Sequence, residues 1–293
     1  IYLGAEVLTE EQISQYHTDG YVIARSVIDE DLLGRVKNVV AEMLNEAQGL
    51  RDHDEKFDLE PSHSLSSPKV RRIKTPHKWH SIFWELIQTK NMVNCLTCLL
   101  GADVRLHGSK LNLKSAHDGS AVEWHQDWAF YPHSNDHVLA VGLMLDDMTM
   151  DNGPLMLVPG SHRVEKVWDH HQDGHFCGAI SPSLNQDLDF DSAVPCIGKA
   201  GDCSFHHVRL VHGSAQNVSK DSRRLMLYEC AAADAWPYFR FSDLEEFNSR
   251  MIAGRPTVEP RATNVPVRMP FPPAKKQGSI YESQTMLTDR FFK

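Results

Sequence analysis

Residues 104–114 read VRLHGSKLNLK, and this alternating run opens the part of the chain that decides the fold. Similar runs follow at 122–131 (VEWHQDWAFY), 138–147 (VLAVGLMLDD), 154–161 (PLMLVPGS), 201–213 (GDCSFHHVRLVHG) and 223–230 (RRLMLYEC). Gly, Pro, Asp or Asn interrupts them about every ten residues, which is typical of short antiparallel strands joined by turns. The pattern predicts a mainly β fold, either a β-sandwich or a jelly-roll barrel.

The chain before residue 101 has helical rather than alternating periodicity. Thr9 with Gln12 has the form of a capping box. Asp29 can cap a second helix, whose apolar residues recur at helical spacing at positions 32, 33, 36, 39, 40, 43 and 44. The polar residues 51–69 predict a loop, and Gly101 is expected to end a last helical stretch.

No internal repeat and no long linker divides the chain, so residues 1–293 are predicted to form one domain. Its parts are a mainly helical N-terminal part (1–101), a jelly-roll core (102–230) and a C-terminal segment (231–293). The C-terminal segment is rich in proline between residues 255 and 273. Because proline fixes φ and lacks the N–H group, this stretch is expected to wrap the surface without regular structure.

The composition argues against several classes of protein. Lys+Arg 30 against Asp+Glu 39 gives a formal net charge of −9, whereas general nucleic-acid binding needs a basic surface. No apolar run approaches the length needed to cross a bilayer, so no membrane association is expected. The first residue is Ile1 rather than Met, and targeting at that end is unreadable.

Two of the 6 cysteines, Cys95 and Cys98, form a C-x-x-C within NMVNCLTCLLG. No second pair lies nearby to complete a zinc site, and no thioredoxin-like strand precedes them. The motif therefore predicts inert core thiols in a helix. This cysteine usage predicts a reduced, intracellular and cytoplasmic protein.

The run at 122–131 carries a His-x-Asp triplet, His125 and Asp127, among several aromatic rings. On a strand, residues i and i+2 point the same way, so the imidazole and the carboxylate would share a face. The triplet alone is either half of a metal site or a hydrogen-bonded pair. The best candidate for a distant third ligand is His212, at the end of a strand entered through the turn at Gly201-Asp202. Two His and one carboxylate leave three metal positions open, as in sites for Fe(II) and O2 chemistry.

Those open positions suit a chelating 2-oxo acid in two of them and O2 in the third. Such a cosubstrate has a far carboxylate that requires a cation. Arg223 and Arg224 lie on the next predicted strand, and alternation allows only one of them to face the barrel interior. A guanidinium is the natural bidentate partner of that carboxylate.

These motifs together resemble the phytanoyl-CoA dioxygenase family of Fe(II)/2-oxoglutarate oxygenases, which includes the ectoine hydroxylases. The resemblance rests on HQD (125–127), NGPLMLVPGSH (152–162), GD (201–202) and HGSAQNVSKDSR (212–223), and it covers residues 9–230. It implies a double-stranded β-helix core, a cupin-like jelly roll with flanking α-helices. It also implies Fe(II), 2-oxoglutarate as cosubstrate, and O2.

The resemblance also assigns roles to residues. The iron ligands of the family correspond to His125, Asp127 and His212. The cosubstrate-binding Arg of the family lies eleven positions after its second His, which selects Arg223. Ser214 corresponds to a Ser that contacts the same carboxylate, and Asn112 corresponds to an Asn that helps hold 2-oxoglutarate in ectoine hydroxylases.

The substrate is predicted to be a small and anionic molecule. Lys110 lies two residues before Asn112 on the same predicted strand face and matches a substrate-contacting Arg of ectoine hydroxylases. Lys74 is a second candidate cation, and solvated surface lysines are the alternative for both. Of the aromatic residues beside the triplet, Trp128 and Tyr131 are candidates for the pocket mouth, with core packing as the alternative.

The remaining histidines have simpler interpretations. His206 and His207 are predicted to pack within a strand rather than to bind metal. The stretch DHHQDGH (169–175) predicts either solvent-exposed imidazoles or a pocket lid.

The sequence therefore predicts a 2-oxoglutarate-dependent dioxygenase that hydroxylates an unactivated C–H bond, with succinate and CO2 as co-products. Related halogenases replace the carboxylate ligand with a small residue, so Asp127 favours hydroxylation. The alternatives are another oxidative outcome, such as desaturation or cyclisation, and a non-catalytic jelly-roll module that binds a metal or ligand. Such a module would not require Arg223 with Ser214. The sequence carries no signal of oligomeric state.

Overall fold

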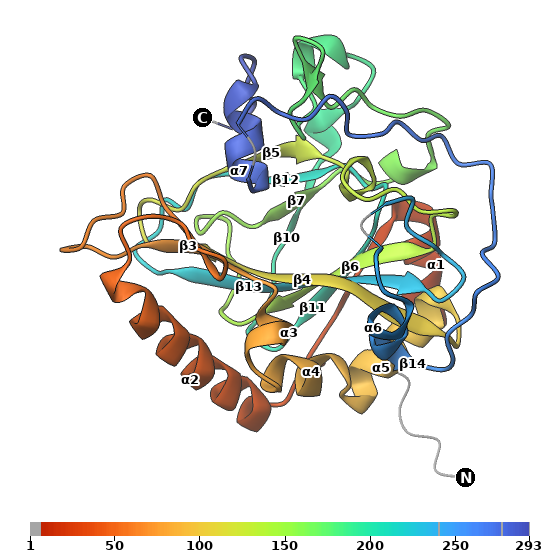
Figure 1. Cartoon of the computed structure of the whole chain (residues 1–293), viewed down its shortest axis with the longest axis horizontal. Coiled ribbons are helices and arrows are strands. Elements are labelled where there is room, and N and C mark those ends of the chain that lie inside the picture. The colour runs from red at the N-terminus through yellow and green to blue at the C-terminus, as the bar shows by residue number, and fades with distance from the viewer. Residues whose placement is uncertain (1–6, 240, 277, 293) are drawn as a thin grey trace.

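A large antiparallel sheet runs across the middle of the molecule (Figure 1). The computed structural model describes residues 7–239, 241–276 and 278–292, so Ile1 lies outside the described residues. The sheet has the strand order β1-β11-β6-β13-β4-β3-β2, and β14 also pairs with β4. The strands are β1 (Tyr21–Ala24), β2 (Phe57–Leu59), β3 (Val70–Lys74), β4 (Val104–Lys114), β6 (Val138–Met144), β11 (Cys203–His207), β13 (Arg223–Ala232) and β14 (Met251–Ala253).

A smaller sheet lies over the large one and closes the jelly roll (Figure 1). Its order is β10-β7-β12-β5, with strands β5 (Val122–His125), β7 (Leu155–Leu157), β10 (Val194–Cys196) and β12 (His212–Ser214). Met144 and Leu225 from the large sheet pack with Leu157 and Cys196 from the small sheet in one buried cluster. The predicted fold, a mainly β jelly roll with flanking helices, is confirmed.

The N-terminal helices cover the outer face of the large sheet (Figure 1). Their apolar sides join strand residues such as Phe205 and Tyr228 in the main core, and the Tyr228 hydroxyl donates to the Phe83 carbonyl at 2.6 Å. The capping box of Thr9 and Gln12 and the Asp29 cap are both present. The helices are α1 (Glu10–Asp19), α2 (Glu30–Glu46), α3 (Pro76–Trp79), α4 (Ile82–Ile87) and α5 (Lys90–Leu100), with the 3-10 turn η1 (Ala47–Gly49) after α2.

The N-terminal part is less purely helical than its periodicity indicates. Strand β1 pairs with β11 and strand β3 pairs with β4, so both belong to the large sheet. The stretch 51–69 contains the short strand β2 rather than only a loop. Strands of three to five residues are too short to show a clear alternation, and their pairing partners lie far along the chain.

Helix α5 corrects the interpretation of the C-x-x-C motif. Cys95 faces the core, where burial raises the pKa of its thiol to about 12, but Cys98 is exposed. Only the first of the two cysteines is therefore a core thiol. The two positions are neighbours on the helix surface, but the buried stripe of α5 includes Cys95 and leaves Cys98 outside it.

The chain between the jelly-roll strands and after them forms the remaining short elements. Strands β8 (His171–Gln172) and β9 (His175–Phe176) pair with each other. The 3-10 turns are η2 (Asp127–Ala129), η3 (Ser161–Arg163), η4 (Pro182–Leu184), η5 (Phe190–Ser192) and η6 (Gln284–Met286). Helix α6 (Leu244–Ser249) precedes β14, residues 255–273 have no helix or strand, and helix α7 (Ile280–Ser283) lies beside β5 (Figure 1).

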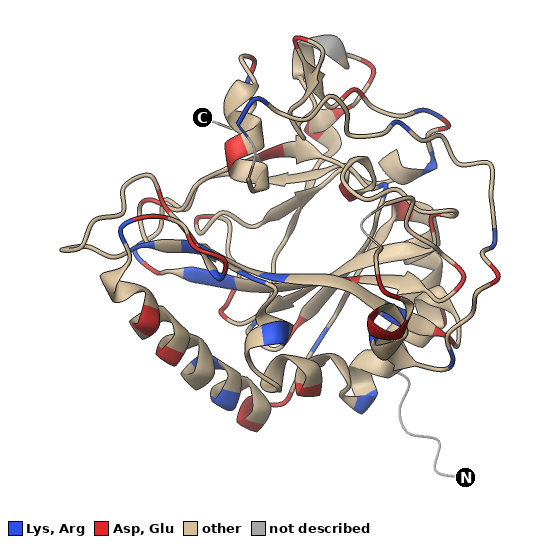
Figure 2. Ribbon diagram, viewed as in Figure 1, with Lys and Arg blue, Asp and Glu red and all other residues tan. Residues whose placement is uncertain are grey.

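Charged residues of both signs are interspersed on the outer helices, as α2 illustrates in Figure 2. None of the helices among the described residues combines the length and the apolar character that a membrane crossing requires.

Candidate metal and cosubstrate site

Three buried side chains meet between the two sheets. Strand β5 ends at His125, strand β12 begins at His212, and the register of these antiparallel strands pairs the two residues directly. Their ring centroids are 4.1 Å apart. With Asp127, they offer ligand atoms that all lie within 4.8 Å of one another, which is the spacing of a metal site.

Both imidazoles are held with one nitrogen facing the site. His125 Nδ1 lies 2.8 Å from the Glu123 carbonyl, and His212 Nδ1 lies 2.9 Å from the Leu210 carbonyl. Because a carbonyl only accepts, each Nδ1 must carry the proton and each Nε2 presents a lone pair. Burial lowers the pKa of both histidines, so the neutral form that binds a metal is the stable one.

Asp127 reaches the site through a turn rather than through strand alternation. The strand ends at His125, and Asp127 is the first residue of η2. The residue between them is fixed, since the Gln126 N–H donates to His170 Nε2 at 2.9 Å. Trp128 N–H donates to the Val208 carbonyl at 2.9 Å. The prediction that strand alternation brings His125 and Asp127 together is therefore wrong in its cause. The two side chains still meet, since His125 Nε2 and Asp127 Oδ1 lie 4.0 Å apart.

The surroundings keep Asp127 ionised. Burial alone would raise the pKa of this carboxyl, but Lys110 and the neighbouring imidazoles of His212, His125 and His206 bring it below its usual value. A buried carboxylate among three histidines is suited to a cation, which it attracts without prior loss of a proton.

His206 is buried within β11 and is not one of the three grouped ligand residues, in line with the packing role predicted for it, but it also lies beside them. Its Nε2 lies 3.9 Å from Asp127 Oδ2, and its ring centroid lies 4.7 Å from that of His212. Burial lowers its pKa to about 3. His207 points away and lies 3.9 Å from the Asp136 carboxylate. Alternation on β11 could have placed one of the two inside the barrel, but not which one.

The second histidine ligand also sits differently from the sequence prediction. The strand entered through Gly201-Asp202 is β11 in the large sheet, and it ends at His207. His212 begins β12 in the small sheet. The four residues between the strands carry the chain from one sheet to the other, a change that hydrophobic periodicity does not reveal.

Two of the residues assigned to 2-oxoglutarate are buried, and the third lines a cavity beside the candidate metal ligands. Arg223 and Ser214 are buried, and Asn112 lines a small cavity of about 50 Å³ together with the three ligand residues. Within the described residues, Arg223 Nε and Asn112 Oδ1 have no hydrogen-bond partner, whereas Arg223 Nη2 donates to the Gly153 carbonyl. Buried polar atoms without partners are expected where a ligand supplies them.

Gly153 is required beside Arg223 by its conformation and its neighbours. Its φ is +70°, and a Cβ there would lie 2.6 Å from the Ala215 carbonyl oxygen and 3.0 Å from Lys114 Cδ. Lys114, which pairs with Arg223 in the register of β4 and β13, is itself buried and donates to the Ala215 carbonyl. Burial and the Arg223 charge lower the pKa of Lys114 well below its usual value.

The two adjacent arginines lie on opposite faces of β13. Arg224 donates from Nε at 2.8 Å and from Nη2 at 2.6 Å to the Asp146 carboxylate, outside the barrel. Arg223 faces inward, where burial lowers its pKa to about 10, so the guanidinium stays charged at neutral pH. The alternation that selected one arginine for the interior is present in the structure.

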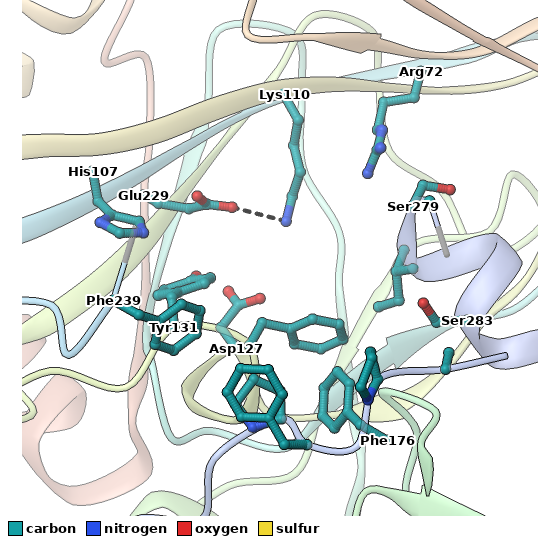
Figure 3. Close-up of a pocket in the computed structure, with 17 residues that line it drawn as sticks. Arg72, His107, Lys110, Asp127, Tyr131, Phe176, Glu229, Phe239, Ser279 and Ser283 are labelled. Carbon is teal, nitrogen blue, oxygen red and sulfur yellow. Dashed lines mark hydrogen bonds and ion pairs between the residues drawn. The ribbon is translucent and has the colours of Figure 1, made fainter. Parts of the chain in front are cut away.

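A larger cavity of about 550 Å³ adjoins the metal site, and Asp127, Lys110, Arg72 and Ile280 line both cavities. Lys110 donates to Glu229 Oε1 at 3.0 Å (Figure 3). Burial alone would lower the pKa of Lys110, but Glu229 and Asp127 raise it. The further lining residues are His107, Phe130, Tyr131, Phe176, Phe239, Pro270, Phe271, Pro273, Ala274, Gly278, Ser279 and Ser283.

Two candidates for substrate binding are placed elsewhere. Trp128 is absent from the cavity lining, and its indole Nε1 donates to the Pro266 carbonyl at 2.9 Å in a core cluster. Alternation counted from His125 also places Trp128 on the face opposite to His125 and Asp127, so the core-packing alternative is the one observed. Lys74 is paired with Asp58 at 3.2 Å and does not line the cavity. Tyr131 does line it.

Several lining residues were not found from the sequence. Arg72 pairs with Asn112 in the register of β3 and β4, which requires knowing that β3 exists. Glu229 lies six residues after Arg223 on β13, so the same alternation that selected the arginine could have found it. Phe176, which follows the stretch 169–175, lines the cavity, whereas His170 and His171 of that stretch are buried rather than solvent-exposed.

A family model for phytanoyl-CoA dioxygenase (PhyH) matches residues 16–225. The chain belongs to this family. It is 36% identical over 285 residues to the "Probable alpha-ketoglutarate-dependent hypophosphite dioxygenase" of Stutzerimonas stutzeri, covering 96% of this chain and 99% of the relative. It is 29% identical over 230 residues to an ectoine dioxygenase of Bordetella parapertussis, covering 73% of this chain and 72% of the relative.

The fold is also that of a solved relative. The crystal structure of EctD from S. alaskensis with 2-oxoglutarate and 5-hydroxyectoine superposes with a TM-score of 0.68 at 23% identity, covering 90% of this chain and 89% of that one. As a member of the PhyH family, the chain is an oxidoreductase of the 2-oxoglutarate-dependent dioxygenase class. This decides against the alternative of a non-catalytic module.

Proposed function

We propose that this PhyH-family chain is a dioxygenase in which His125, Asp127 and His212 hold Fe(II). The observation that carries the proposal is the cluster of three ligand atoms within 4.8 Å, two of them imidazole nitrogens with fixed lone pairs. One carboxylate and two imidazoles suit a first-row metal and leave positions open for other ligands. The pairing of each Nδ1 with a backbone carbonyl orients both rings before the metal binds.

Arg223, Ser214 and Asn112 fit 2-oxoglutarate. This cosubstrate carries two carboxylates, and the far one needs a cation in a buried place. Arg223 supplies a charged guanidinium with an unpartnered Nε among the described residues, and Ser214 is a buried residue of β12 in the small sheet. Asn112 lines the small cavity together with His125, Asp127 and His212. Charge-assisted contacts of this kind are the strong hydrogen bonds of a protein interior.

Bound iron, 2-oxoglutarate and O2 together supply the oxidising chemistry, with succinate and CO2 as co-products. The protein determines which C–H bond of the substrate is oxidised. Asp127 lines both cavities, so a molecule in the larger cavity stands next to the metal ligands. Phe130, Phe176 and Phe271 form an apolar wall that keeps water away from the reacting centre.

We infer that the substrate is a small organic molecule with an anionic group, and that it is hydroxylated. The cations Arg72 and Lys110 line the cavity beside the metal site and suit a carboxylate, phosphonate or phosphate. The S. stutzeri relative is named for hypophosphite, a small phosphorus oxyanion. A volume of about 550 Å³ is far larger than that ion requires, so the anionic group is one end of a larger molecule.

A substrate screen tests this function. Protein with Fe(II), 2-oxoglutarate and O2 is incubated with small carboxylates, phosphonates and hypophosphite, and succinate formation is measured. We expect selected organic anions to raise succinate formation above the substrate-free rate, with one oxygen atom added to the product by mass spectrometry. Stimulation only by uncharged or purely cationic compounds would contradict the anionic substrate. A product that has lost two hydrogens would replace hydroxylation by desaturation.

A further inference from the structure

The two ends of the large cavity differ in charge and in chemistry. In Figure 3, Arg72 lies on the side of Ser279 and Ser283, whereas Glu229 lies on the side of Tyr131. Lys110 descends between the two ends from β4. A cavity for a simple anion needs only the first of these ends, so the second end calls for another binding role.

The first end is built to receive an acidic group. Arg72 is held in place by an ion pair of 2.7 Å between its Nη2 and Asp58 Oδ2, and its buried Nε has no hydrogen-bond partner among the described residues. Ser283 faces the same space from α7, and Ser279 also lines the cavity, but its hydroxyl donates to the Glu282 carboxylate in the capping box of that helix. Hydroxyl groups and a fixed guanidinium are donors that an oxyanion accepts from.

The second end is built to receive a cation. Glu229 presents a carboxylate that is only 13% exposed, and its Oε1 accepts from Lys110. The aromatic rings of Tyr131 and Phe239 stand beside it (Figure 3). A carboxylate with aromatic faces is the usual environment of a bound ammonium group.

The backbone makes room for this carboxylate. Gly108 is the register partner of Glu229 across β4 and β13. A Cβ at position 108 would lie 2.6 Å from Glu229 Oε2, so any other residue there would displace the carboxylate. The glycine thus allows Glu229 to occupy its place in the cavity wall.

We propose that the substrate is a zwitterion, with its acidic group at Arg72 and Lys110 and its ammonium group at Glu229. The carbon between the charged groups then stands over Asp127, which lies between the two ends in Figure 3. Without substrate, Lys110 and Glu229 neutralise each other at 3.0 Å. A zwitterion replaces both halves of this pair, since its acid accepts from Lys110 while its ammonium donates to Glu229. This inference rests on the proposed function.

Binding titrations under anaerobic conditions test the proposal without turnover. The protein is loaded with Fe(II) and 2-oxoglutarate, and calorimetry measures dissociation constants for ω-amino acids from glycine to 5-aminopentanoate and for 3-aminopropylphosphonate. The matched probes are the alkanoates, propylphosphonate and the alkylammonium ions of the same length. We expect at least one amino acid or aminophosphonate to bind about ten- to a hundred-fold more tightly than both of its singly charged analogues. The phosphonate arm identifies the preferred acid.

The variant Glu229→Gln gives a signature that a merely structural role would not produce. Zwitterion binding should weaken by about ten-fold or more, whereas binding of the plain acid should strengthen, because Lys110 loses its counterion. Glu229→Asp should restore part of the zwitterion preference. Glu259→Gln, an exposed carboxylate in the C-terminal segment, is the matched control and should leave all constants unchanged. Arg72→Met should weaken the acids and the zwitterions alike.

The outcomes separate this inference from the function on which it rests. If Fe(II) and 2-oxoglutarate fail to bind to the wild-type protein, the proposed function fails. If they bind but no zwitterion binds more tightly than its plain acid, the zwitterion proposal is overturned and the dioxygenase function stands. A Glu229→Gln protein that keeps the zwitterion preference would also overturn it.

Discussion

The metal end of the barrel and the large cavity beside it are built in different ways. The metal ligands come from the end of β5, the η2 turn and the start of β12, and backbone carbonyls orient both imidazoles. The cavity is lined by side chains from β3, β4 and β13, by residues at and after η2, by Phe176 of β9, and by C-terminal residues from the irregular stretch before α7 and from α7 itself. The first region is a local arrangement fixed by the backbone, and the second is assembled from distant parts of the chain.

The family match covers the metal end but only part of the cavity. It includes Arg72 and Lys110 and ends at residue 225, before Glu229, Phe239 and the lining residues 270–283. We therefore expect the reaction chemistry to depend on the metal end and the choice of substrate to depend largely on the cavity. Changes at the metal end should abolish all turnover, whereas changes in the cavity should alter which molecule is bound.

The largest effect is expected at the metal ligands. His125→Ala or His212→Ala removes one of three ligands and should lower iron affinity by more than the roughly ten- to hundred-fold loss that follows removal of an outer partner. Turnover should fall to background while the circular dichroism spectrum is retained. Iron content after gel filtration is the measurement, with His17→Ala, an exposed imidazole, as the control. Unchanged iron content in either variant would show that the ligand assignment is wrong.

The arginine pair on β13 is expected to show the next largest effect. Arg223→Ala should raise the apparent Michaelis constant for 2-oxoglutarate about ten- to a hundred-fold, since a charge-assisted bidentate contact contributes about 1.5–3 kcal/mol. Arg223→Lys should recover only part of this, because an ammonium lacks the planar fork. Arg224→Ala should leave the constant within a few-fold of wild type, because Arg224 pairs with Asp146 outside the barrel.

Steady-state titration of 2-oxoglutarate measures all three arginine variants. A large defect in Arg224→Ala without one in Arg223→Ala would contradict the inward orientation of Arg223, and the assignment of Ser214 would fall with it.

The C-terminal segment should affect substrate binding but not cosubstrate binding. Gln284 is buried, accepts from the Glu123 N–H at 2.9 Å and donates to the Gly178 carbonyl at 2.9 Å. Gln284→Ala leaves these groups unsatisfied, which costs about 1–3 kcal/mol, and loosens the segment that lines the cavity. The apparent Michaelis constant for the substrate should rise several-fold, whereas that for 2-oxoglutarate should stay unchanged. Gln186→Ala, an exposed glutamine, is the control. Equal changes in both constants would argue against the division.

A smaller effect is expected in the pH dependence of stability. Burial lowers the pKa of His170 to about 4, and its Nε2 must stay unprotonated to accept from the Gln126 N–H. The unfolded chain, with an ordinary pKa of about 6.5, takes up the proton first as the pH falls. His170 should therefore remove up to about 1.4 kcal/mol of stability per pH unit between about pH 6.5 and pH 4, and none above that range.

Urea unfolding at several pH values measures this slope. His170→Gln should flatten the curve over that pH interval, because an amide does not titrate, whereas His17→Gln should leave it unchanged. An identical slope in wild type and His170→Gln would remove His170 as the titrating group.

Sequence reasoning recovered the metal end better than the cavity for a physical reason. The ligand residues belong to short motifs whose residue types are dictated by metal chemistry, so they can be recognised in the sequence alone. Their strand assignment was less accurate, since Asp127 lies in a turn and His212 opens a strand of the second sheet. Arg72 enters the cavity only because the three-to-five-residue strands of the N-terminal part join the large sheet. Trp128 could have been excluded from the sequence, because alternation counted from His125 places it on the opposite face.

The central claim is that this barrel binds Fe(II) and 2-oxoglutarate together through its two histidines, Asp127 and Arg223. Its most direct test is the visible absorption of the anaerobic protein during titration with each component. The account predicts a weak charge-transfer band that appears only when both Fe(II) and 2-oxoglutarate are present. The band should be lost in His212→Ala and should require more 2-oxoglutarate in Arg223→Ala. Absence of the band in wild type, or an undiminished band in His212→Ala, would contradict the account.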